Sequence, residues 1–358
     1  MRNIYLSNSL ATYRVDLCNA LYREFACEIF FFADVPADSC MDVEEMRSRA
    51  LFPDRHLRVR TFAGCKWASG IRALLHQYTP QVVFVPEFSL LAIQFLRYRR
   101  KYGFRLISFC DDSLNMIEGN DFSRFHRLAR RIMPRFLDQI VVSSAPVAQW
   151  YQARFGKGLV MPIIADDVLL RERLAAALPR AEAFRVKYGL AAEKVVLFVG
   201  RLVALKNLPV LLEAVASLSF PVRLVIVGDG VEAGKLKAMT AGTARVLFTG
   251  EQHGEDLLAW YQLADVLVLP STQEAYGAVT GEALTAGCPV VVSRLAGSSD
   301  LVREGENGFR FDPHSPAQLS QKLDSLLQQG PAGRPLALRP SLLDRHFRTC
   351  IQQLLARL

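Results

Sequence analysis

The sequence predicts an α/β protein made of two Rossmann-like, doubly wound domains. Its 358 residues are more than a domain with a single hydrophobic core usually contains, and 51% of them are hydrophobic, which is enough for two cores. Short β-branched or aromatic runs alternate with helical patterns, and this alternation occurs twice along the chain. We therefore expect two parallel sheets in two domains that face each other across a cleft, with ligands beyond the carboxyl ends of the strands.

Six strands are expected in each half, because apolar runs there end in turn residues. Several are continuous rather than alternating, which is typical of parallel strands covered on both faces. Those of the first half are Ile4–Leu6, Glu28–Phe32, Gln81–Val85, Arg105–Phe109, Gln139–Val142 and Leu159–Ile163. Those of the second half are Lys194–Val199, Arg223–Val227, Arg245–Phe248, Val266–Leu269, Pro289–Val292 and Phe309–Phe311.

Helical periodicity fills the stretches between these strands. The expected helices are Tyr13–Phe25, Gly70–Tyr78, Leu90–Tyr102, Ser123–Asp138, Leu208–Ser217, Leu257–Leu263, Ala278–Ala286 and Pro316–Gln328. The charged, alanine-rich stretch Asp166–Lys187 is expected to hold the domain boundary. The predicted domains are therefore residues 1–165 and 166–340, and residues 341–358 form a terminal helix that packs back on the first domain.

Composition narrows the class of protein. The seven cysteines include no C-x-x-C pair, which argues against a zinc site or a disulfide framework and suits a reducing cytosol. The chain starts without the apolar core of a signal peptide, and no apolar stretch approaches the roughly 20 residues that span a bilayer. We expect a cytoplasmic protein that can also lie peripherally on the inner face of the cell membrane.

The formal charge of +8 lies mainly in the first half, where residues 1–165 hold 22 Lys and Arg against 15 Asp and Glu. Such a surface could attract nucleic acid, anionic lipid or a phosphorylated substrate. The alternative is a basic protein with solvated arginines. Nucleic acid is not an expected partner, because no RNA- or DNA-binding motif accompanies the charge.

The first informative motif begins at Gly200, where a buried strand ends. Its loop carries Arg201 and Lys206, and a helix follows with Pro209 in its first turn. A loop of this shape can hold a diphosphate, because an arginine grips oxygens in a bidentate manner and a lysine supplies a point charge. The alternative is that both cations are surface residues beside a helix start.

The second motif follows the strand Val266–Leu269. The strand ends in a Pro-Ser pair, and a helix begins close to Gly277, where free backbone amides and the helix dipole form an anion site. Glu274 precedes that helix in a cleft-facing loop, and Glu282 lies within it. Two glutamates eight residues apart are frequent by chance and are a weak signal alone. The Pro-Ser pair before Glu274 and the glycine between the two glutamates favour a functional site over chance.

These motifs resemble the large retaining glycosyltransferase family 4, also called glycosyl transferases group 1, which has the GT-B fold. That family has a G-R-L…K loop, a P-S…E-x-x-G…E-A segment and a G-x-P-V-V sequence, which is Gly287–Val291 here. Gly297–Val302 and Gly305–Phe309 stand where the family usually has G-G-x-x-E-x-V and N-G. The resemblance covers about residues 194–313, where the matching motifs follow one another closely. The first half resembles the family only in its strand–helix rhythm.

The resemblance implies roles for these residues. Glu274 would be the catalytic residue that contacts the transferred sugar near its reacting carbon, and Glu282 would bind the ribose hydroxyls. Both cations of the first motif would hold the donor diphosphate, and three backbone positions would complete that site. The implied donor-binding set is Arg201, Lys206, Glu282, Gly277, Ala278 and Val279. No metal or other cofactor is expected, because cations and amides would stabilise the departing diphosphate.

The first half departs from the family. The segment after its first strand has no glycine, so Arg14 is expected to contact the donor phosphate or the acceptor, unless it is a solvated residue of the first helical turn. Many members have a cleft-facing histidine where this chain has Asp111 and Asp112. Asp111 is the candidate to take the acceptor proton, and Asp112 is a candidate acceptor contact. Either could instead cap the next helix, and this alternative is slightly favoured for Asp112.

The six histidines are scattered and are expected to be structural. A basic, amphipathic pattern in the helix expected at 123–138 could dock on anionic lipid. The alternative is a core-packed helix with a solvated face. The basic stripe is Arg124, Arg127, Arg131 and Arg135, and the apolar stripe beside it is Phe125, Leu128, Ile132 and Phe136.

Together, these features predict a retaining, metal-independent glycosyltransferase. It would move a sugar from a nucleoside diphosphate to a hydroxyl of a glycan or lipid-linked oligosaccharide, in the biosynthesis of a surface polysaccharide such as lipopolysaccharide. Two alternatives remain open at this point. One is a nucleotide-sugar epimerase or glycan phosphorylase on the same fold, and the other is a non-catalytic protein that binds membrane surfaces.

Overall fold

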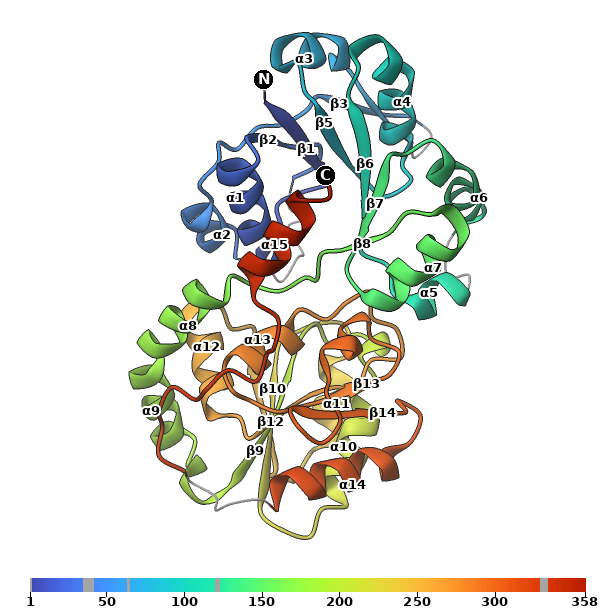
Figure 1. Ribbon diagram of the computed structural model, residues 1–358. Helices are drawn as coiled ribbons and strands as arrows, with labels where there is room; N and C mark the ends of the chain where they lie inside the picture. Colours follow the sequence, from blue (N-terminus) through green and yellow to red (C-terminus); the bar gives the residue numbers. More distant parts are fainter. Residues whose placement is uncertain (1, 35–41, 63–64, 120–122, 329–333) are drawn as a thin grey trace. The chain divides into compact units, whose positions relative to one another are not determined.

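The computed structural model describes residues 2–34, 42–62, 65–119, 123–328 and 334–358 (Figure 1). These form two compact units. Unit 1 consists of Met1–Ile163 together with Arg348–Leu358, and unit 2 consists of Ile164–Phe347. The first crossing lies two residues before the predicted boundary, and the last residues of the chain belong to the first unit, as expected of a returning terminal helix.

The main sheet of unit 1 has six parallel strands in the order β2-β1-β5-β6-β7-β8. All six predicted strands are present, although β8 is only two residues long. The strands are β1 Asn3–Ser7, β2 Cys27–Phe31, β5 Val82–Pro86, β6 Arg105–Cys110, β7 Gln139–Val142 and β8 Leu159–Val160. The strand order reverses between β1 and β5, which is where a doubly wound sheet opens a crevice at its carboxyl edge.

The helices of unit 1 include three that the sequence patterns did not predict, α2, α5 and α7. An antiparallel hairpin of β3 Val59–Phe62 and β4 Cys65–Ala68 was also not predicted. The helices are η1 Thr12–Arg14, α1 Val15–Glu24, α2 Val43–Arg49, α3 Ile71–Tyr78, α4 Leu90–Tyr102, α5 Leu114–Glu118, α6 Arg124–Ile132, η2 Met133–Arg135, α7 Ala145–Phe155 and α15 Phe347–Leu355, where η marks a short 3₁₀ helix.

The sheet of unit 2 has six parallel strands in the order β11-β10-β9-β12-β13-β14. In chain order this is 3-2-1-4-5-6, the dinucleotide-binding Rossmann arrangement, with its reversal between β9 and β12. All six are predicted strands. They are β9 Lys194–Val199, β10 Val222–Val227, β11 Val246–Gly250, β12 Val266–Leu269, β13 Val290–Ser293 and β14 Gly308–Phe311.

The stretch expected to hold the domain boundary is helical instead. It forms α8 Asp167–Ala176 and α9 Leu178–Lys187, and both belong to unit 2. The side chain of Asp166 caps α8 by accepting hydrogen bonds from the amides of Val168 and Leu169. Apolar residues at helical spacing then pack inward, so a charged and alanine-rich composition here marks an amphipathic helix pair rather than a linker.

Of the other helices of unit 2, α10, α12, α13 and α14 were predicted, whereas α11 and the three 3₁₀ helices were not. These helices are η3 Leu190–Ala192, η4 Ala204–Lys206, α10 Leu208–Ala216, α11 Ala233–Met239, α12 Gly254–Leu263, α13 Val279–Thr285, η5 Gly297–Leu301 and α14 Pro316–Leu327. Helix α12 packs on α9, where the rings of Phe184 and Trp260 have centroids 4.9 Å apart.

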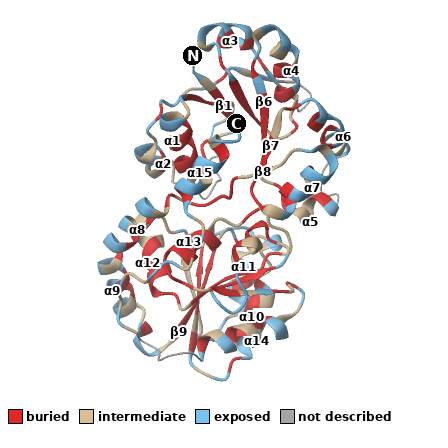
Figure 2. Cartoon of the chain, in the orientation of Figure 1, coloured by how far each residue is buried: buried red, intermediate tan, exposed pale blue. Residues whose placement is uncertain are grey.

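Burial confirms that the sheets are covered on both faces. Every residue of β2, β9, β12 and β13 is buried (Figure 2). Continuous apolar runs are therefore strands in the middle of a helix–sheet–helix sandwich. The rigid strands end at one edge in each unit, and the loops at that edge carry the predicted site residues.

The terminal helix α15 is shorter than the predicted segment. Ile351 and Leu354 are each 1% exposed, so one face of α15 is buried. The chain leading to it is held on unit 2, because Arg339 donates to the carbonyl oxygens of Tyr261 and Ala264 at the end of α12. Phe347, the first residue of α15, is the last residue of unit 2, and its amide donates to the Asp167 side chain over 3.0 Å.

Candidate active site

In unit 2, the loops after β9 and β10 run against each other. The Gly200 amide donates to the Val227 carbonyl over 3.0 Å, and Leu202 donates to Asp229 over 2.8 Å. A Cβ atom on Gly228, whose φ is 134°, would lie 2.0 Å from the Gly200 carbonyl oxygen. Gly228 is therefore required for this close approach, and it fixes the backbone from which the two cations of the first motif project.

The two predicted motifs of unit 2 meet at the edge where the strand order reverses. Lys206, at the end of η4, makes an ion pair with Glu274, which follows β12. The side chains are only 17% and 15% exposed, so the pair is largely shielded from water. Lys206 is therefore not a surface residue beside a helix start, which was the alternative for this motif. The pair places a carboxylate and an ammonium group together at the carboxyl ends of β9 and β12.

The loop that carries Glu274 is fixed from both sides. The buried Ser271 hydroxyl donates to Glu274 Oε2 over 3.2 Å, so one carboxylate oxygen is held by both Ser271 and Lys206. On the other side, the Gly297 amide donates to the Glu274 carbonyl over 3.3 Å, and a Cβ on Gly297 would lie 2.2 Å from the Ala275 carbonyl oxygen. The carboxylate thus has a defined position before any substrate binds.

Helix α13 begins directly after this loop. Gly277 has a φ of 93°, which L-residues rarely adopt, and Ala278 is the N-cap without a side-chain cap. Among the residues that the structure describes, no hydrogen bond occupies the Gly277 or Ala278 amide. Val279 starts the helix, and the Thr280 hydroxyl lies 2.9 Å from the Ser298 hydroxyl, which ties the helix start to η5. The predicted backbone positions therefore present amides at the same edge.

Glu282 projects from α13 toward α12. The hydroxyl of Tyr261 donates to Glu282 Oε2 over 2.7 Å. Burial, and then the charge of Glu282, hold the pKa of Tyr261 well above its ordinary value, so the phenol remains a donor at neutral pH. This hydrogen bond orients the Glu282 carboxylate, and carboxylate oxygens accept hydrogen bonds from hydroxyl groups.

Arg201 is the exposed member of the predicted donor set. It directly follows Gly200, and its side chain is exposed to solvent. An exposed arginine next to a shielded ammonium group and two free amides can bind a diphosphate by charge-assisted hydrogen bonds. The unit 2 cluster thus combines an anion site with two oriented carboxylates, which is what a nucleotide-sugar donor requires.

Unit 1 carries a second cluster at its own carboxyl edge. Arg14 is buried and forms an ion pair with Asp111, which follows β6. The guanidinium carbon of Arg14 also lies 5.6 Å from the ring centre of Phe109. The alternative that Arg14 is a solvated residue is therefore wrong, because its charge is buried against a carboxylate. The Asp111 side chain keeps 35% of its surface exposed, so it can still meet a ligand.

Asp112 does not cap the following helix, contrary to the favoured alternative. Ser113 does so, with its hydroxyl accepting from the Met116 amide. Asp112 is instead buried in an ion pair with Arg130 of α6. Burial raises the pKa of Asp112 to about 6 despite the opposite charge of Arg130. Its carboxylate is 7% exposed, so a direct acceptor contact, as predicted, would require this pair to open.

Three residues of this unit 1 cluster were not predicted: Glu87, His126 and Arg130. Glu87 follows β5 with a φ of 47°, a conformation that is unusual for a residue other than glycine. His126 Nδ1 lies 3.8 Å from Glu87, and His126 Nε2 lies 3.1 Å from Arg130. His126, expected to be structural like the other histidines, therefore belongs to a cluster of charged groups. Their separation along the chain gives no motif that could have predicted the cluster.

Burial sets the protonation of this cluster. It raises the pKa of Glu87 to about 7, with further contributions from the negative charges of Asp112 and Asp111. Burial, and then the positive charge of Arg130, lower the pKa of His126. At neutral pH the cluster therefore holds a neutral imidazole and a carboxyl group that exchanges its proton readily. Such groups can orient a hydroxyl and exchange protons with it.

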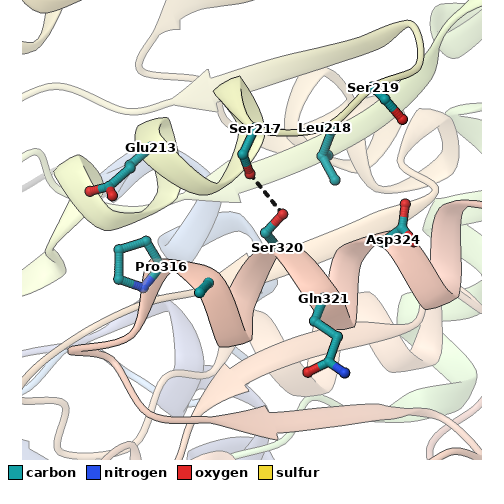
Figure 3. A pocket seen from close by; sticks show the side chains of 9 residues that line it. Glu213, Ser217, Leu218, Ser219, Pro316, Ser320, Gln321 and Asp324 are labelled. Carbon is teal, nitrogen blue, oxygen red and sulfur yellow. Dashed lines mark hydrogen bonds between the residues drawn. The ribbon is translucent and has the colours of Figure 1, made fainter.

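A hollow between α10 and α14 is not part of either cluster. Figure 3 shows its lining, where Ser217 and Ser320 approach within 2.8 Å. Ser217 follows the end of α10 and precedes β10, so the hollow lies at the amino edge of the unit 2 sheet. Parallel sheets bind ligands at the opposite edge.

The described residues contain neither a metal-binding group nor a membrane-spanning helix. No group of three or more His, Cys, Asp or Glu side chains there is arranged to hold a metal ion. Likewise, no helix among those residues is long and apolar enough to cross a bilayer.

Comparison with known proteins identifies the second half of the chain. Residues 193–329 match the family model of glycosyl transferases group 1, which confirms the resemblance for this stretch. D-inositol 3-phosphate glycosyltransferase of Mycobacterium sp. (strain KMS) is 37% identical over 148 residues, covering 39% of this chain and 34% of that protein. Sulfoquinovosyl transferase of Arabidopsis thaliana is 35% identical over 146 residues, covering 40% and 28%. The match thus spans about a third of the length of these relatives.

Solved structures are similar over the whole chain. HepE of Anabaena, solved in complex with UDP and glucose, gives a TM-score of 0.72 at 18% identity, covering 100% of this chain and 98% of that chain. The apo form of WaaB, a lipopolysaccharide outer core galactosyltransferase, gives 0.64 at 15% identity with 100% of both chains covered. At these identities the likeness concerns the fold, and it confirms the predicted GT-B class of two Rossmann-like domains.

Proposed function

We propose that this chain is a glycosyltransferase that uses a nucleoside diphosphate sugar as its donor. One observation carries the proposal: the G-R-L…K and P-S…E-x-x-G…E-A motifs, far apart in the chain, meet through the Lys206–Glu274 ion pair where the unit 2 strand order reverses. The matched relatives are named as transferases of sugars, and HepE was solved with UDP.

In this proposal the donor diphosphate binds Arg201 and Lys206 together with the amides of Gly277, Ala278 and Val279. Lys206 leaves Glu274 for the phosphate, which frees the Glu274 carboxylate to face the transferred sugar. Its position is then maintained by Ser271. A carboxylate beside the reacting carbon stabilises the positive charge that develops as the diphosphate departs.

Glu282 accepts hydrogen bonds from the two ribose hydroxyls of the donor. Support comes from its hydrogen bond with Tyr261, which orients the carboxylate. We include retention of the anomeric configuration and independence of metal ions in the proposal. The cations and amides around the diphosphate would supply the charge stabilisation that a metal ion supplies in other transferases.

The acceptor is assigned to the unit 1 cluster. Asp111 orients the acceptor hydroxyl or takes its proton, and the ion pair with Arg14 holds the Asp111 side chain in position for that task. Asp112 acts on the acceptor only through Arg130, because its carboxylate is buried in that pair. The acceptor class we propose is a glycan or lipid-linked oligosaccharide of a surface polysaccharide. The enzyme would act in the cytoplasm or peripherally at the inner face of the cell membrane.

The proposal is tested by incubating the protein with a panel of nucleoside diphosphate sugars and glycan acceptors, with and without EDTA. We expect release of the nucleoside diphosphate that depends on acceptor, is unchanged by EDTA, and gives a product with the anomeric configuration of the donor by NMR. Conversion of the donor without acceptor would instead indicate an epimerase. Sugar phosphate formed from glycan and inorganic phosphate would indicate a phosphorylase.

A further inference from the structure

Helix α6 and the short η2 after it carry an apolar stripe that faces solvent. The four side chains recur at helical spacing and keep about half of their surface exposed. They are Phe125 at 55%, Leu128 at 55%, Ile132 at 44% and Phe136 at 53%. Monomeric soluble proteins seldom expose contiguous large apolar side chains without an interaction partner. Helix α6 runs along the surface of unit 1, where its outer side is drawn as exposed (Figure 2).

The core contacts of α6 come from a different stripe. Ala129, Arg130 and Met133 are at most 8% exposed and pack inward. The helix is therefore packed on the core, as the alternative holds, but through Ala129 and Met133 and not through the predicted apolar stripe. The helix packs through small and paired residues and leaves its largest apolar side chains outside. A partner surface that covers these exposed side chains would explain the arrangement.

Arginines line the apolar stripe on its solvent side. Between Ser123 and Phe136 the sequence contains no Asp or Glu. Arg130 turns inward to Asp112, whereas the other four arginines form a stripe directly beside the apolar one. These four are Arg124, Arg127, Arg131 and Arg135. A convex helix with aromatic and aliphatic groups next to a purely cationic stripe is complementary to lipid headgroups and acyl chains.

We propose that this surface, the α6 face of Phe125, Leu128, Ile132 and Phe136 with the four flanking arginines, docks on an anionic lipid bilayer. The apolar side chains would enter the boundary between headgroups and acyl chains, and the arginines would bind lipid phosphates. A lipid surface fits better than a protein groove, because the α6 face is convex and carries one sign of charge without polar residues that set a register.

The same helix also contacts the unit 1 cluster. On its inner side, Arg130 pairs with Asp112 and His126 lies 3.8 Å from Glu87. A docked α6 would thus separate the bilayer surface from the cluster by about one helix diameter, roughly 10 Å. If the cluster binds the acceptor, as the proposed function holds, the acceptor is a lipid whose reacting hydroxyl lies within one or two sugar units of the headgroup region.

The docking is tested with the full chain by co-sedimentation with vesicles of phosphatidylcholine alone or mixed with phosphatidylglycerol. The assay needs neither donor nor acceptor, so its failure is distinct from failure of the proposed function. We expect binding only to the anionic vesicles and weaker binding at higher salt. Replacing two apolar or two basic residues of the α6 face should weaken binding by about tenfold or more. The double variants are Phe125→Ser with Phe136→Ser, and Arg124→Glu with Arg131→Glu.

Matched controls remove exposed residues of the same kind elsewhere. The apolar control is Val231→Ser with Met239→Ser, and the charge control is Arg23→Glu with Arg72→Glu, all at exposed positions. We expect the apolar control to bind like the wild type and the charge control to lose no more than a few-fold. The proposal is overturned if the wild type ignores anionic vesicles, or if the controls lose as much binding as the α6 variants.

A second measurement reports contact directly, by comparing Leu128→Trp with the wild type, which has three tryptophans of its own. In Leu128→Trp, the new indole should shift its emission to shorter wavelength with anionic vesicles and be quenched by brominated lipid. Emission unchanged by vesicles that sediment the protein would show docking through another surface and contradict the proposal. Dimerisation in solution that Phe125→Ser with Phe136→Ser abolishes would also contradict it, because the α6 face would then bind a second copy.

Discussion

Lys206 and Glu274 form the contact on which the donor site depends. They come from loops 68 residues apart, and the shielded pair neutralises two charges that would otherwise be costly to desolvate. Donor binding would exchange one partner, since phosphate oxygens replace the carboxylate at Lys206. The pair can therefore serve as a resting state that holds both side chains in place until the diphosphate arrives.

This exchange predicts different effects for binding and turnover. Glu274→Gln keeps the size and the hydrogen bond from Ser271 but removes the negative charge that would stabilise the reacting carbon. We expect kcat to fall by about 10²–10³, with the donor Kd changed by less than about tenfold. Steady-state kinetics and calorimetry measure the two values, and Glu24→Gln on the exposed surface of α1 is the control. Equal kcat in both variants would remove Glu274 from the chemistry.

Glu87 predicts a pH dependence of stability. Its pKa is raised from 4.5 to about 7 by burial first and then by the charges of Asp112 and Asp111. The folded state therefore binds its proton more tightly, and the associated stability is complete below pH 4.5 and lost as pH rises through about 7. Glu87→Gln should be more stable than the wild type at pH 8, because it has no carboxylate to ionise in the folded state. We expect a difference of only about 1 kcal/mol, since solvent screens a carboxyl group that is 44% exposed.

Thermal or urea unfolding between pH 5 and 8 measures this difference. Asp112 also titrates in this range, and its charge interacts with that of Glu87. The difference between the two proteins therefore reports the coupled titration of this pair. The free energy difference should grow with pH and level off above about pH 8. A difference that is constant with pH would mean that the Glu87 carboxyl group is not perturbed by its neighbours.

At the residue scale, predictability from sequence depended on local motifs. Arg201, Lys206 and Glu274 could be selected because each follows a buried strand at a recognisable spacing. Glu87 and His126 could not, because they lie 39 residues apart and meet only through the packing of α6 near the end of β5. Two aspartates were found, but only the structure separates Asp111, which is partly exposed, from the buried Asp112.

At the scale of elements, the donor loop depends on glycines that permit close backbone contact. Gly228→Ala would place a Cβ 2.0 Å from the Gly200 carbonyl oxygen, whereas Gly242→Ala at a φ of 82° would meet no atom within 4 Å. Both variants bear the strain of a positive φ, so the clash alone separates them. We expect Gly228→Ala to be about 1–3 kcal/mol less stable than Gly242→Ala in urea unfolding, and to bind the donor more weakly. Equal stabilities would contradict the close contact.

Elements buried on both faces were the easiest to predict. The runs at β9 and β12 are apolar throughout and end in turns, and helices lie between them as expected. Helix α7 was missed although Pro146 in its first turn and Gly156 at its end are recognised helix signals. Its buried residues are few, so the apolar periodicity that guided the other assignments is weak there. The β3–β4 hairpin was missed because it lies outside the alternating βαβ pattern.

At the scale of the molecule, the chain leaves unit 1, builds unit 2 and returns. The returning helix α15 should therefore stabilise unit 1 and not unit 2. Leu354 is 1% exposed, and Leu354→Ala should cost about 2–4 kcal/mol. Hydrogen exchange should accelerate in β1 to β8 but not in β9 to β14, and the exposed neighbour Gln352→Ala should change neither. Faster exchange confined to unit 2 would contradict the division of the chain.

The sequence predicted a division of the chain within two residues of the observed one, but the stretch expected to hold the boundary is not a linker. Asp166–Lys187 resembles a linker in composition, yet it forms α8 and α9. Such a segment folds into packed helices only where another element offers an apolar surface. Here α12 offers that surface, because its Trp260 contacts Phe184 of α9. Composition contains no information on such long-range packing.

The central claim is that unit 2 binds a nucleoside diphosphate sugar through its two motifs. The most direct measurement is the melting temperature of the wild type and of Glu282→Ala across a panel of nucleoside diphosphate sugars. We expect the melting temperature to rise with one nucleotide, through preferential binding to the folded state, and to rise less in the variant, which lacks the carboxylate for the ribose. No rise with any donor or free nucleoside diphosphate, or an equal rise in both proteins, would contradict the central claim.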